Sequence, residues 1–279
     1  QTGTGKTAAF AIPILEQLAP REEISTVQAL VLVPTRELAV QVRNEFEKLA
    51  YFMDFKTVAI YGGHSIKKQI EELKRGVQVV VGTPGRVLDH IRRKTLDLRE
   101  TWCVTLDEAD RMLDIGFRPD IERILSSISR KDRQTLLLSA TVPPSIERLA
   151  KRYMHEPMVL DFSKDAVSGD SIDQYYFSVD KAKKVELLDR LINRDKPEQA
   201  IIFCRTRRGT DKLAKRLKEK FPNVGCIHGD MNQPVRDRVM KKFRDERLKI
   251  LVATDVVGRG IDVTTISHII NFDTPEDCD

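Results

Sequence analysis

Short apolar runs alternate with amphipathic stretches along most of the chain. Residues 29–33 form an apolar run of strand length, whereas residues 36–51 carry Leu38, Val42 and Phe46 at helical spacing. The predicted strands are residues 29–33, 57–61, 77–81, 103–107, 135–139, 158–162, 174–179, 200–204, 224–228, 249–253 and 268–271. The predicted helices are residues 8–18, 36–51, 65–74, 119–129, 144–153, 182–193, 208–220 and 234–243, with another beginning at Arg86. This alternation predicts the α/β fold class, with two tandem, mostly parallel sheets and helices on both faces.

One stretch interrupts the alternation. Residues 163–173 are small and polar and have no sustained period, which predicts an interdomain linker. The linker separates a domain at residues 1–162 from a domain at residues 174–279, and both are near the common domain size of about 100–150 residues. The two halves share no obvious sequence repeat, but they repeat the same alternation of strands and helices.

Composition narrows the class of protein. With 41% hydrophobic and 32% charged residues, the 279-residue chain has the composition of a soluble globular protein. No apolar run approaches the roughly 18 residues of a membrane span, and we expect a cytoplasmic location, or a nuclear one in a eukaryote. The net charge of +5 favours a polyanionic partner. The four cysteines form no C-x-x-C pair, and three of them lie in apolar strand-like runs, which indicates buried, reduced thiols.

Two adjacent carboxylates end a predicted strand. Residues 103–106 are mostly apolar, and Asp107 and Glu108 follow directly. In α/β sheets ligands bind outside the carboxyl ends of the strands. Asp107 is placed where a P-loop enzyme holds Mg²⁺, and Glu108 is placed to orient or deprotonate a water molecule. A solvated acidic helix start is the alternative for this short segment taken alone.

The first seven residues, Gln1-Thr2-Gly3-Thr4-Gly5-Lys6-Thr7, supply the partner of these acids. They match the end of the phosphate loop G-x-x-x-x-G-K-[ST], in which Lys6 reaches the β/γ-phosphates and Thr7 binds Mg²⁺. The first glycine of the pattern and the strand that feeds the loop would precede Gln1. We therefore expect the chain to come from a longer protein, with the missing strand in the middle of the first sheet.

Further motifs follow in a fixed order. They are Pro34-Thr35-Arg36-Glu37-Leu38-Ala39, Gly62-Gly63, Thr83-Pro84-Gly85-Arg86, Asp107-Glu108-Ala109-Asp110, Ser139-Ala140-Thr141, Ile202-Phe203-Cys204-Arg205-Thr206, His228-Gly229-Asp230, Gln233 with Arg236, Ala253-Thr254-Asp255 and Arg259-Gly260-Ile261-Asp262. With these motifs, nearly the whole chain resembles a DEAD-box RNA helicase of superfamily 2. The resemblance implies two RecA-like domains that face each other across a cleft, ATP and Mg²⁺ as cofactors, and RNA as partner.

The resemblance also assigns site residues. The catalytic residues it implies are Lys6, Asp107, Glu108, Ser139 and Thr141, with Thr7 and Asp107 at the metal. The ATP-binding residues it implies are Thr2, Gly3, Thr4, Gly5, Lys6 and Thr7, and from the second domain Arg259, Gly260 and Asp262. For Ser139 and Thr141 the residues alone leave two roles open. Their hydroxyls either link the acidic loop to the site or cap the helix after Pro143, and the family's third motif favours the link.

A second group of residues combines glycine, threonine and arginine at strand ends. Glycine lets a sugar–phosphate backbone approach, hydroxyl and amide groups bond to phosphate oxygens, and arginine neutralises them. The predicted RNA-binding residues are Pro34, Thr35, Arg36, Gly62, Gly63, Thr83, Pro84, Gly85, Arg86, Gly229, Asp230, Gln233, Arg236, Thr254 and Asp255. No aromatic RNA-binding motif is present, so we expect contacts to the backbone with little base preference. His64 is interpreted as a loop histidine.

These features predict an RNA-stimulated ATPase with a monomeric core that separates short RNA duplexes or remodels ribonucleoproteins. One alternative is an ATP-gated RNA clamp with little turnover, and another is a superfamily 2 DNA helicase. The family's adenine-reading Q motif would lie before Gln1, and its last arginine motif would lie after Asp279. Without them we expect the 279-residue chain by itself to fold poorly and to hydrolyse little ATP.

Overall fold

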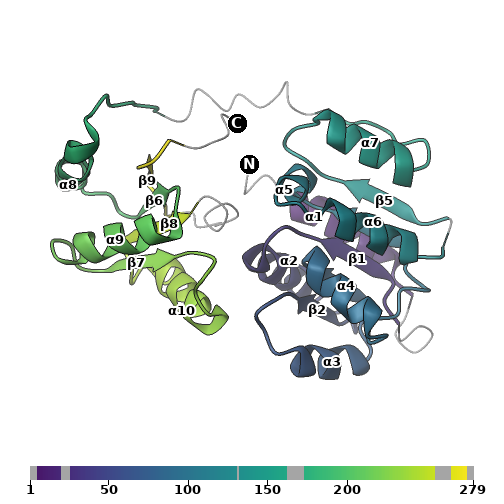
Figure 1. Ribbon diagram of the computed structural model, residues 1–279. Helices are drawn as coiled ribbons and strands as arrows, with labels where there is room; N and C mark the ends of the chain where they lie inside the picture. Colours follow the sequence, from purple (N-terminus) through teal and green to yellow (C-terminus); the bar gives the residue numbers. More distant parts are fainter. Residues whose placement is uncertain (1–4, 20–25, 131, 162–172, 255–264, 275–279) are drawn as a thin grey trace. The chain divides into compact units, whose positions relative to one another are not determined.

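The protein is described by a computed structural model that covers residues 5–19, 26–130, 132–161, 173–254 and 265–274 (Figure 1). The chain forms two compact units, Gln1–Pro157 and Met158–Asp279. Each unit is a parallel sheet with helices on both faces, so the predicted fold class is confirmed. Of the linker predicted at residues 163–173, residues 163–172 lie outside the described residues.

The first unit contains five paired strands. They are β1 (Ala29–Leu32), β2 (Thr57–Ile60), β3 (Val79–Gly82), β4 (Cys103–Leu106) and β5 (Gln134–Leu137). All pairs are parallel, in the order β2-β3-β1-β4-β5. Leu32 at the end of β1 is level with Gly82 on one side and Leu106 on the other. The carboxyl ends of the three inner strands therefore lie at one level of the sheet.

Helices cover both faces of this sheet because its strands are apolar on both sides (Figure 1). The helices are α1 (Lys6–Gln17), α2 (Arg36–Leu49), α3 (Ile66–Lys74), α4 (Pro84–Arg92), α5 (Ala109–Asp114), α6 (Arg118–Ser127) and α7 (Pro144–Tyr153). Val31 packs with Phe10 of α1 and Phe46 of α2 in one core. Leu30 and Leu32 belong to the opposite core, which α4, α5, α6 and α7 complete.

The second unit repeats this plan. Its strands are β6 (Ala200–Cys204), β7 (Val224–Ile227), β8 (Ile250–Thr254) and β9 (His268–Asn271), all parallel, in the order β7-β8-β6-β9. Its helices are the 3₁₀ helix η2 (Lys181–Lys183), α8 (Lys184–Asp195), α9 (Arg207–Lys218) and α10 (Gln233–Arg244). Helices α8 and α9 pack on one face of the sheet, and α10 packs on the other.

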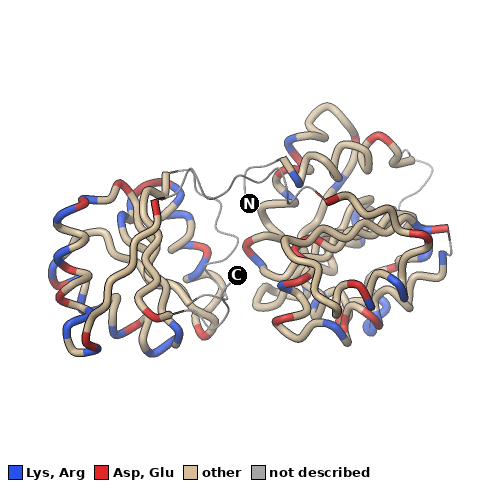
Figure 2. The backbone as a smooth tube through the Cα atoms, turned by 90° about the horizontal axis from the view of Figure 1, so that it is seen from above, with Lys and Arg blue, Asp and Glu red and all other residues tan. Residues whose placement is uncertain are grey.

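Charged residues of both signs are interspersed on the helices and loops of each unit, and the strands are mostly uncharged (Figure 2). This distribution follows from the apolar strand sequences, because a strand that is covered on both faces leaves no solvated position for a charge. Of the helices described, none is both long and apolar enough to cross a bilayer.

Two predicted strands are wrong where the structure describes them. Residues 158–161 and 174–179 have no regular secondary structure, and Met158 and Tyr176 are 83% and 94% exposed. Both segments have strand-like composition, but a strand requires hydrogen bonds from a neighbouring strand. No strand in the described part of the chain pairs with either segment.

Two further points differ from the sequence-based expectation. Helix α5 was not expected, because its six residues are too few to show an apolar period. The strand predicted at residues 135–139 is β5, which ends at Leu137, lies at the edge of the described sheet and is half-exposed. By contrast, α7, β6 and β9 have their predicted bounds.

The first testable prediction concerns the close packing at the end of β3. A Cβ atom added at Gly82 would lie 2.6 Å from Val87 Cγ2, 2.8 Å from Ile60 Cγ1 and 2.9 Å from the Ile60 carbonyl oxygen. We expect Gly82→Ala in the whole protein to lower the free energy of unfolding by about 1–3 kcal/mol, as overpacking does. Urea unfolding measures this change.

Gly85→Ala is the matched control in the urea experiment, because its Cβ would meet Asp120 Oδ2 at an ordinary 3.7 Å. Equal stability of the two variants would contradict the packing argument for Gly82.

Candidate active site and nucleic-acid interface

The acidic pair lies in a strained turn at the end of β4. The backbone N–H of Asp107 donates to the Leu32 carbonyl at 2.9 Å, which continues the ladder between β4 and β1 past the last strand residue. Glu108 follows with φ 52° and ψ 51°, in the left-handed region, and its N–H donates to Asp107 Oδ1 at 3.0 Å. Such a conformation costs a non-glycine residue roughly 1–3 kcal/mol. The sheet thus holds both carboxylates in a fixed arrangement.

Burial raises the pKa of Asp107 to about 6, and the neighbouring Glu108 carboxylate adds to the rise. The charge of Lys6 acts in the opposite direction. A buried carboxylate that is costly to ionise is stabilised by a cation at that position. The oxygen donors of Asp107 and Thr7 are of the kind that Mg²⁺ prefers, so these residues fit a magnesium site.

The start of helix α1 is the second part of the site. Gly5 has φ +77°, which favours glycine, and its carbonyl accepts from the Ala9 N–H at 2.9 Å. Lys6 and Thr7 are therefore the first two helical residues, at the end of the helix that attracts anions. The predicted ATP-binding residues Thr2, Gly3 and Thr4 lie outside the described residues.

Arg111 is a neighbour of Glu108 that the motif did not identify. Its Nη1 lies 3.0 Å from Glu108 Oε2, and its side chain is largely buried. The spacing of three residues on a helix is the sequence signal that could have indicated this pair. The ion pair fixes the side chain of Glu108 on the side of the helix that carries Arg111.

Asp110 joins the acidic loop to the segment after β5. Its Oδ2 accepts from both the N–H and the hydroxyl of Thr141 at 3.0 Å, and its own N–H donates to Ser139 Oγ at 3.3 Å. Burial alone would raise the pKa of Asp110, but hydrogen bonds from Arg111, Thr141 and Ser139 together lower it. Asp110 was absent from the predicted site residues. The Ser139 hydroxyl accepts from this loop and the Thr141 hydroxyl donates to it, whereas the N-cap residue of α7 is Pro143.

The predicted RNA-binding residues of the first unit meet at the carboxyl edge of β2, β3 and β1. The guanidinium group of Arg36 lies over the Gly62–Gly63 turn, and a Cβ at Gly63 would be 2.4 Å from its Nη1. Gly63 also has φ +81°. Within the described protein, Gly63 therefore allows the close approach of Arg36 and the left-handed turn, in addition to any approach by RNA.

Other members of this set hold the local backbone. The side-chain oxygen of Thr35 accepts from the Leu38 N–H at 3.3 Å and caps α2. Thr83 precedes α4, and Pro84 and Gly85 are its first residues. Pro34 follows β1 and is buried. These residues connect the ends of β1 and β3 to the helices that begin there.

The second unit has a similar arrangement at the ends of β7, β8 and β6. Arg207, which sequence reasoning did not select, forms an ion pair with Asp230 and lies 3.7 Å from a Cβ built on Gly229. Thr254 ends β8. Gln233 donates to Asp237 Oδ1 at 2.7 Å. Both Gln233 and Arg236 are buried in α10, and the remaining predicted residues, Asp255, Arg259, Gly260 and Asp262, lie outside the described residues.

The second prediction concerns the cost of burying Asp107. Because its pKa rises from 3.8 to about 6 on folding, the folded protein favours the protonated carboxyl group. Above pH 6 ionisation therefore costs about 3 kcal/mol, and this cost vanishes as the pH falls towards 4. We expect Asp107→Asn to raise the free energy of unfolding at pH 7 by up to about 3 kcal/mol and to give no gain near pH 4.

This prediction is measured on the whole protein by urea unfolding across pH, with chelator and without nucleotide. Asp54→Asn, at an exposed position of the same unit, is the control and should give no such gain. A destabilised Asp107→Asn protein at pH 7 would show that the carboxylate is needed for folding instead.

Comparison with known proteins finds matches in both units. The DEAD/DEAH box helicase family model matches residues 1–149, and the model of the helicase conserved C-terminal domain matches residues 183–279. The chain is 48% identical to the DEAD-box ATP-dependent RNA helicase CshA of Geobacillus kaustophilus, covering 99% of this chain and 59% of that protein. For CshA of Bacillus subtilis the values are 45%, 99% and 56%. The chain thus spans somewhat more than half the length of these relatives.

Solved structures of similar proteins also match the chain over almost its whole length. Dbp5 of S. cerevisiae bound to RNA and ADP BeF3 has a TM-score of 0.88 and 36% identity, and the match covers 99% of this chain and 69% of that one. A DEAD box protein from Methanococcus jannaschii has a TM-score of 0.55 and 42% identity, with coverage of 99% and 74%. Together with the family models, these matches establish that the chain belongs to the DEAD/DEAH box helicase family.

Proposed function

We propose that the protein is an ATP-dependent RNA helicase, which couples ATP hydrolysis to local separation of RNA duplexes or remodelling of ribonucleoproteins. One observation carries the proposal: a single sheet presents both the acidic nucleotide site, after β4, and the glycine–arginine group, after β1, β2 and β3. Adjacent strand ends offer a direct route for coupling nucleotide state to RNA contact. The names of the relatives support the choice of RNA.

At the nucleotide site, the residues of the first unit divide the work of phosphoryl transfer. Lys6 and the N-terminus of α1 bind phosphate oxygens. Thr7 and Asp107 would hold a magnesium ion, which would neutralise the charge that develops on the phosphates. Glu108 orients the attacking water and accepts its proton. Arg111, bonded to Glu108, keeps that carboxylate in place.

The link from Asp110 to Ser139 and Thr141 is suited to transmit the nucleotide state. It connects the turn that holds Glu108 with the segment after β5 through hydrogen bonds of 3.0 to 3.3 Å. At the same edge of the sheet, the ends of β1 and β3 lead to Arg36 and Arg86, whose guanidinium groups match phosphate oxygens without reading bases. We further propose a monomeric core that acts in the cytoplasm.

Phosphate release by the whole protein, measured with and without single-stranded RNA, tests this function. A helicase should turn over ATP repeatedly and faster with RNA, whereas an ATP-gated clamp should bind RNA without repeated turnover. Competition between RNA and DNA single strands separates the RNA helicase from a DNA helicase. Equal stimulation by both strands would contradict the RNA assignment.

The third prediction addresses Glu108 in the whole protein. We expect Glu108→Gln to lower the rate of ATP hydrolysis by roughly 100-fold or more, the usual contribution of an acid–base group. Binding of ATP and RNA should persist, because Lys6, Thr7 and Asp107 remain. Steady-state turnover and nucleotide affinity are the two measurements.

Glu71→Gln, at an exposed position of α3, controls for the loss of one negative charge. Loss of ATP binding in Glu108→Gln would show that Glu108 supports the fold of the site and does not act on the water.

A further inference from the structure

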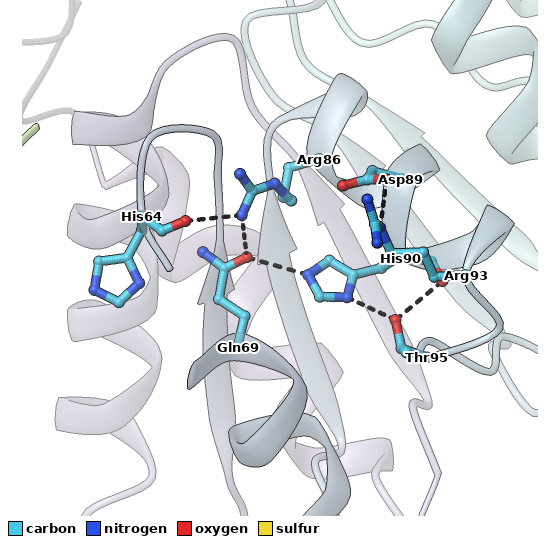
Figure 3. Close-up of polar contacts among 7 residues, drawn as sticks. All are labelled: His64, Gln69, Arg86, Asp89, His90, Arg93 and Thr95. Carbon is cyan, nitrogen blue, oxygen red and sulfur yellow. Dashed lines mark hydrogen bonds and ion pairs between the residues drawn. The ribbon is translucent and has the colours of Figure 1, made fainter. Parts of the chain in front are cut away.

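A buried group of polar side chains lies behind the glycine turn of the first unit (Figure 3). Gln69 of α3 and His90 of α4 are 1% and 0% exposed. They connect Arg86, at the start of α4, with Thr95, just beyond its end. The sequence analysis assigned no role to Gln69, His90 or Thr95. An apolar set of residues would fill the same space without the cost of desolvating polar groups, so the hydrogen bonds require an explanation.

The group holds the glycine turn on both sides. Gln69 Nε2 donates to the Tyr61 carbonyl at 3.1 Å, just before the glycines. Arg86 Nη1 donates to the His64 carbonyl at 3.1 Å, just after them. The same Nη1 donates to Gln69 Oε1 at 3.0 Å, so the two anchors are joined. Gly63 lies between these anchors, in its left-handed conformation.

His90 completes the hydrogen bonds of Gln69. Its Nε2 lies 3.1 Å from Gln69 Oε1, and its Nδ1 lies 2.8 Å from Thr95 Oγ1. Because the amide nitrogen of Gln69 is used at Tyr61, Oε1 is an acceptor, and His90 donates from Nε2. Burial, followed by the charge of Arg86, lowers the pKa of His90, which favours this neutral form with one N–H. Gln69 Oε1 thus receives two donors.

This arrangement leaves one edge of Arg86 for a ligand. Both of its bonds to the protein start from Nη1, and within the described residues Nε and Nη2 have no protein partner. The side chain is partly exposed. A guanidinium group that is fixed at one nitrogen loses little further freedom when its other N–H groups bind a phosphate.

We propose that Gln69 and His90 are positioning residues for RNA: they fix Arg86 in the arrangement that receives an RNA phosphate. The proposal rests on the proposed function, because RNA is the ligand. Neither residue touches RNA, and both act through Arg86. His90 acts one step further away, because it contacts Gln69 and not Arg86.

A double-mutant cycle in the whole protein tests the proposal. Gln69→Met keeps an unbranched side chain of similar length but removes every hydrogen bond of the amide. We expect it to weaken binding of single-stranded RNA about tenfold, the order of a lost bond to a charged group. In an Arg86→Ala background, the same change should weaken binding less than about twofold further, because the group being positioned is gone.

A positioning role must be separated from a general loss of folding, which would also change the ATP parameters. The KM for RNA should rise about tenfold in Gln69→Met, whereas the KM for ATP and the ATPase rate at saturating RNA should stay within about twofold. His90→Leu should resemble a milder Gln69→Met. His90→Gln keeps an N–H donor at the reach of Nε2 and should restore RNA affinity to within about twofold of wild type. Arg92→Ala, an exposed arginine of α4, controls for loss of charge.

The outcomes separate the two claims. A wild-type protein that neither binds RNA nor is stimulated by it would overturn the proposed function. If the wild type is stimulated by RNA, equal weakening by Gln69→Met with and without Arg86 would overturn the positioning role. A parallel rise in the KM for ATP, or His90→Gln behaving like His90→Leu, would overturn it as well. The cycle with His90→Leu gives the same decision if Gln69→Met fails to fold.

Discussion

The site depends on a backbone ladder that continues beyond the ends of the strands in the first sheet. The N–H groups of Val33, Thr83, Asp107 and Leu138 each donate to a carbonyl of the neighbouring strand, at 2.9 to 3.1 Å. Ala109 then donates to Leu138, so the acidic turn is bonded to the segment after β5. Parallel strands place all these ends at one edge. Loops that would otherwise be mobile therefore begin from fixed positions.

This framework supports groups that would be unfavourable elsewhere. Glu108 adopts a left-handed conformation, Asp107 is buried with a raised pKa, and Gly82 allows close packing between Ile60 and Val87. Each of these features is energetically costly or intolerant of substitution in isolation. They persist because the ladder and the two apolar cores over-determine the backbone around them.

The two units have the same local arrangement at one strand end, after β1 in the first unit and after β6 in the second. Thr35 and Thr206 both cap the helix that follows, by accepting from the N–H three residues later. The next residue in each unit is an arginine, which lies against the glycine-bearing turn that follows the next strand but one in the sheet. The amino-acid sequences of the two halves show no obvious repeat, so this correspondence becomes visible only in the fold.

The sequence by itself determined the alternating α/β plan and the residues of the phosphate loop, the acidic pair and the glycine turns, because apolar period and short motifs are local properties. It did not determine which apolar runs become strands: residues 158–161 and 174–179 fail because no described strand pairs with them. It also missed Asp110, Arg111 and Arg207, and the pairing of Gln69 with His90 across 21 positions. Such contacts depend on how α3, α4 and the strand ends pack together. Only the tertiary structure brings those side chains within hydrogen-bonding distance.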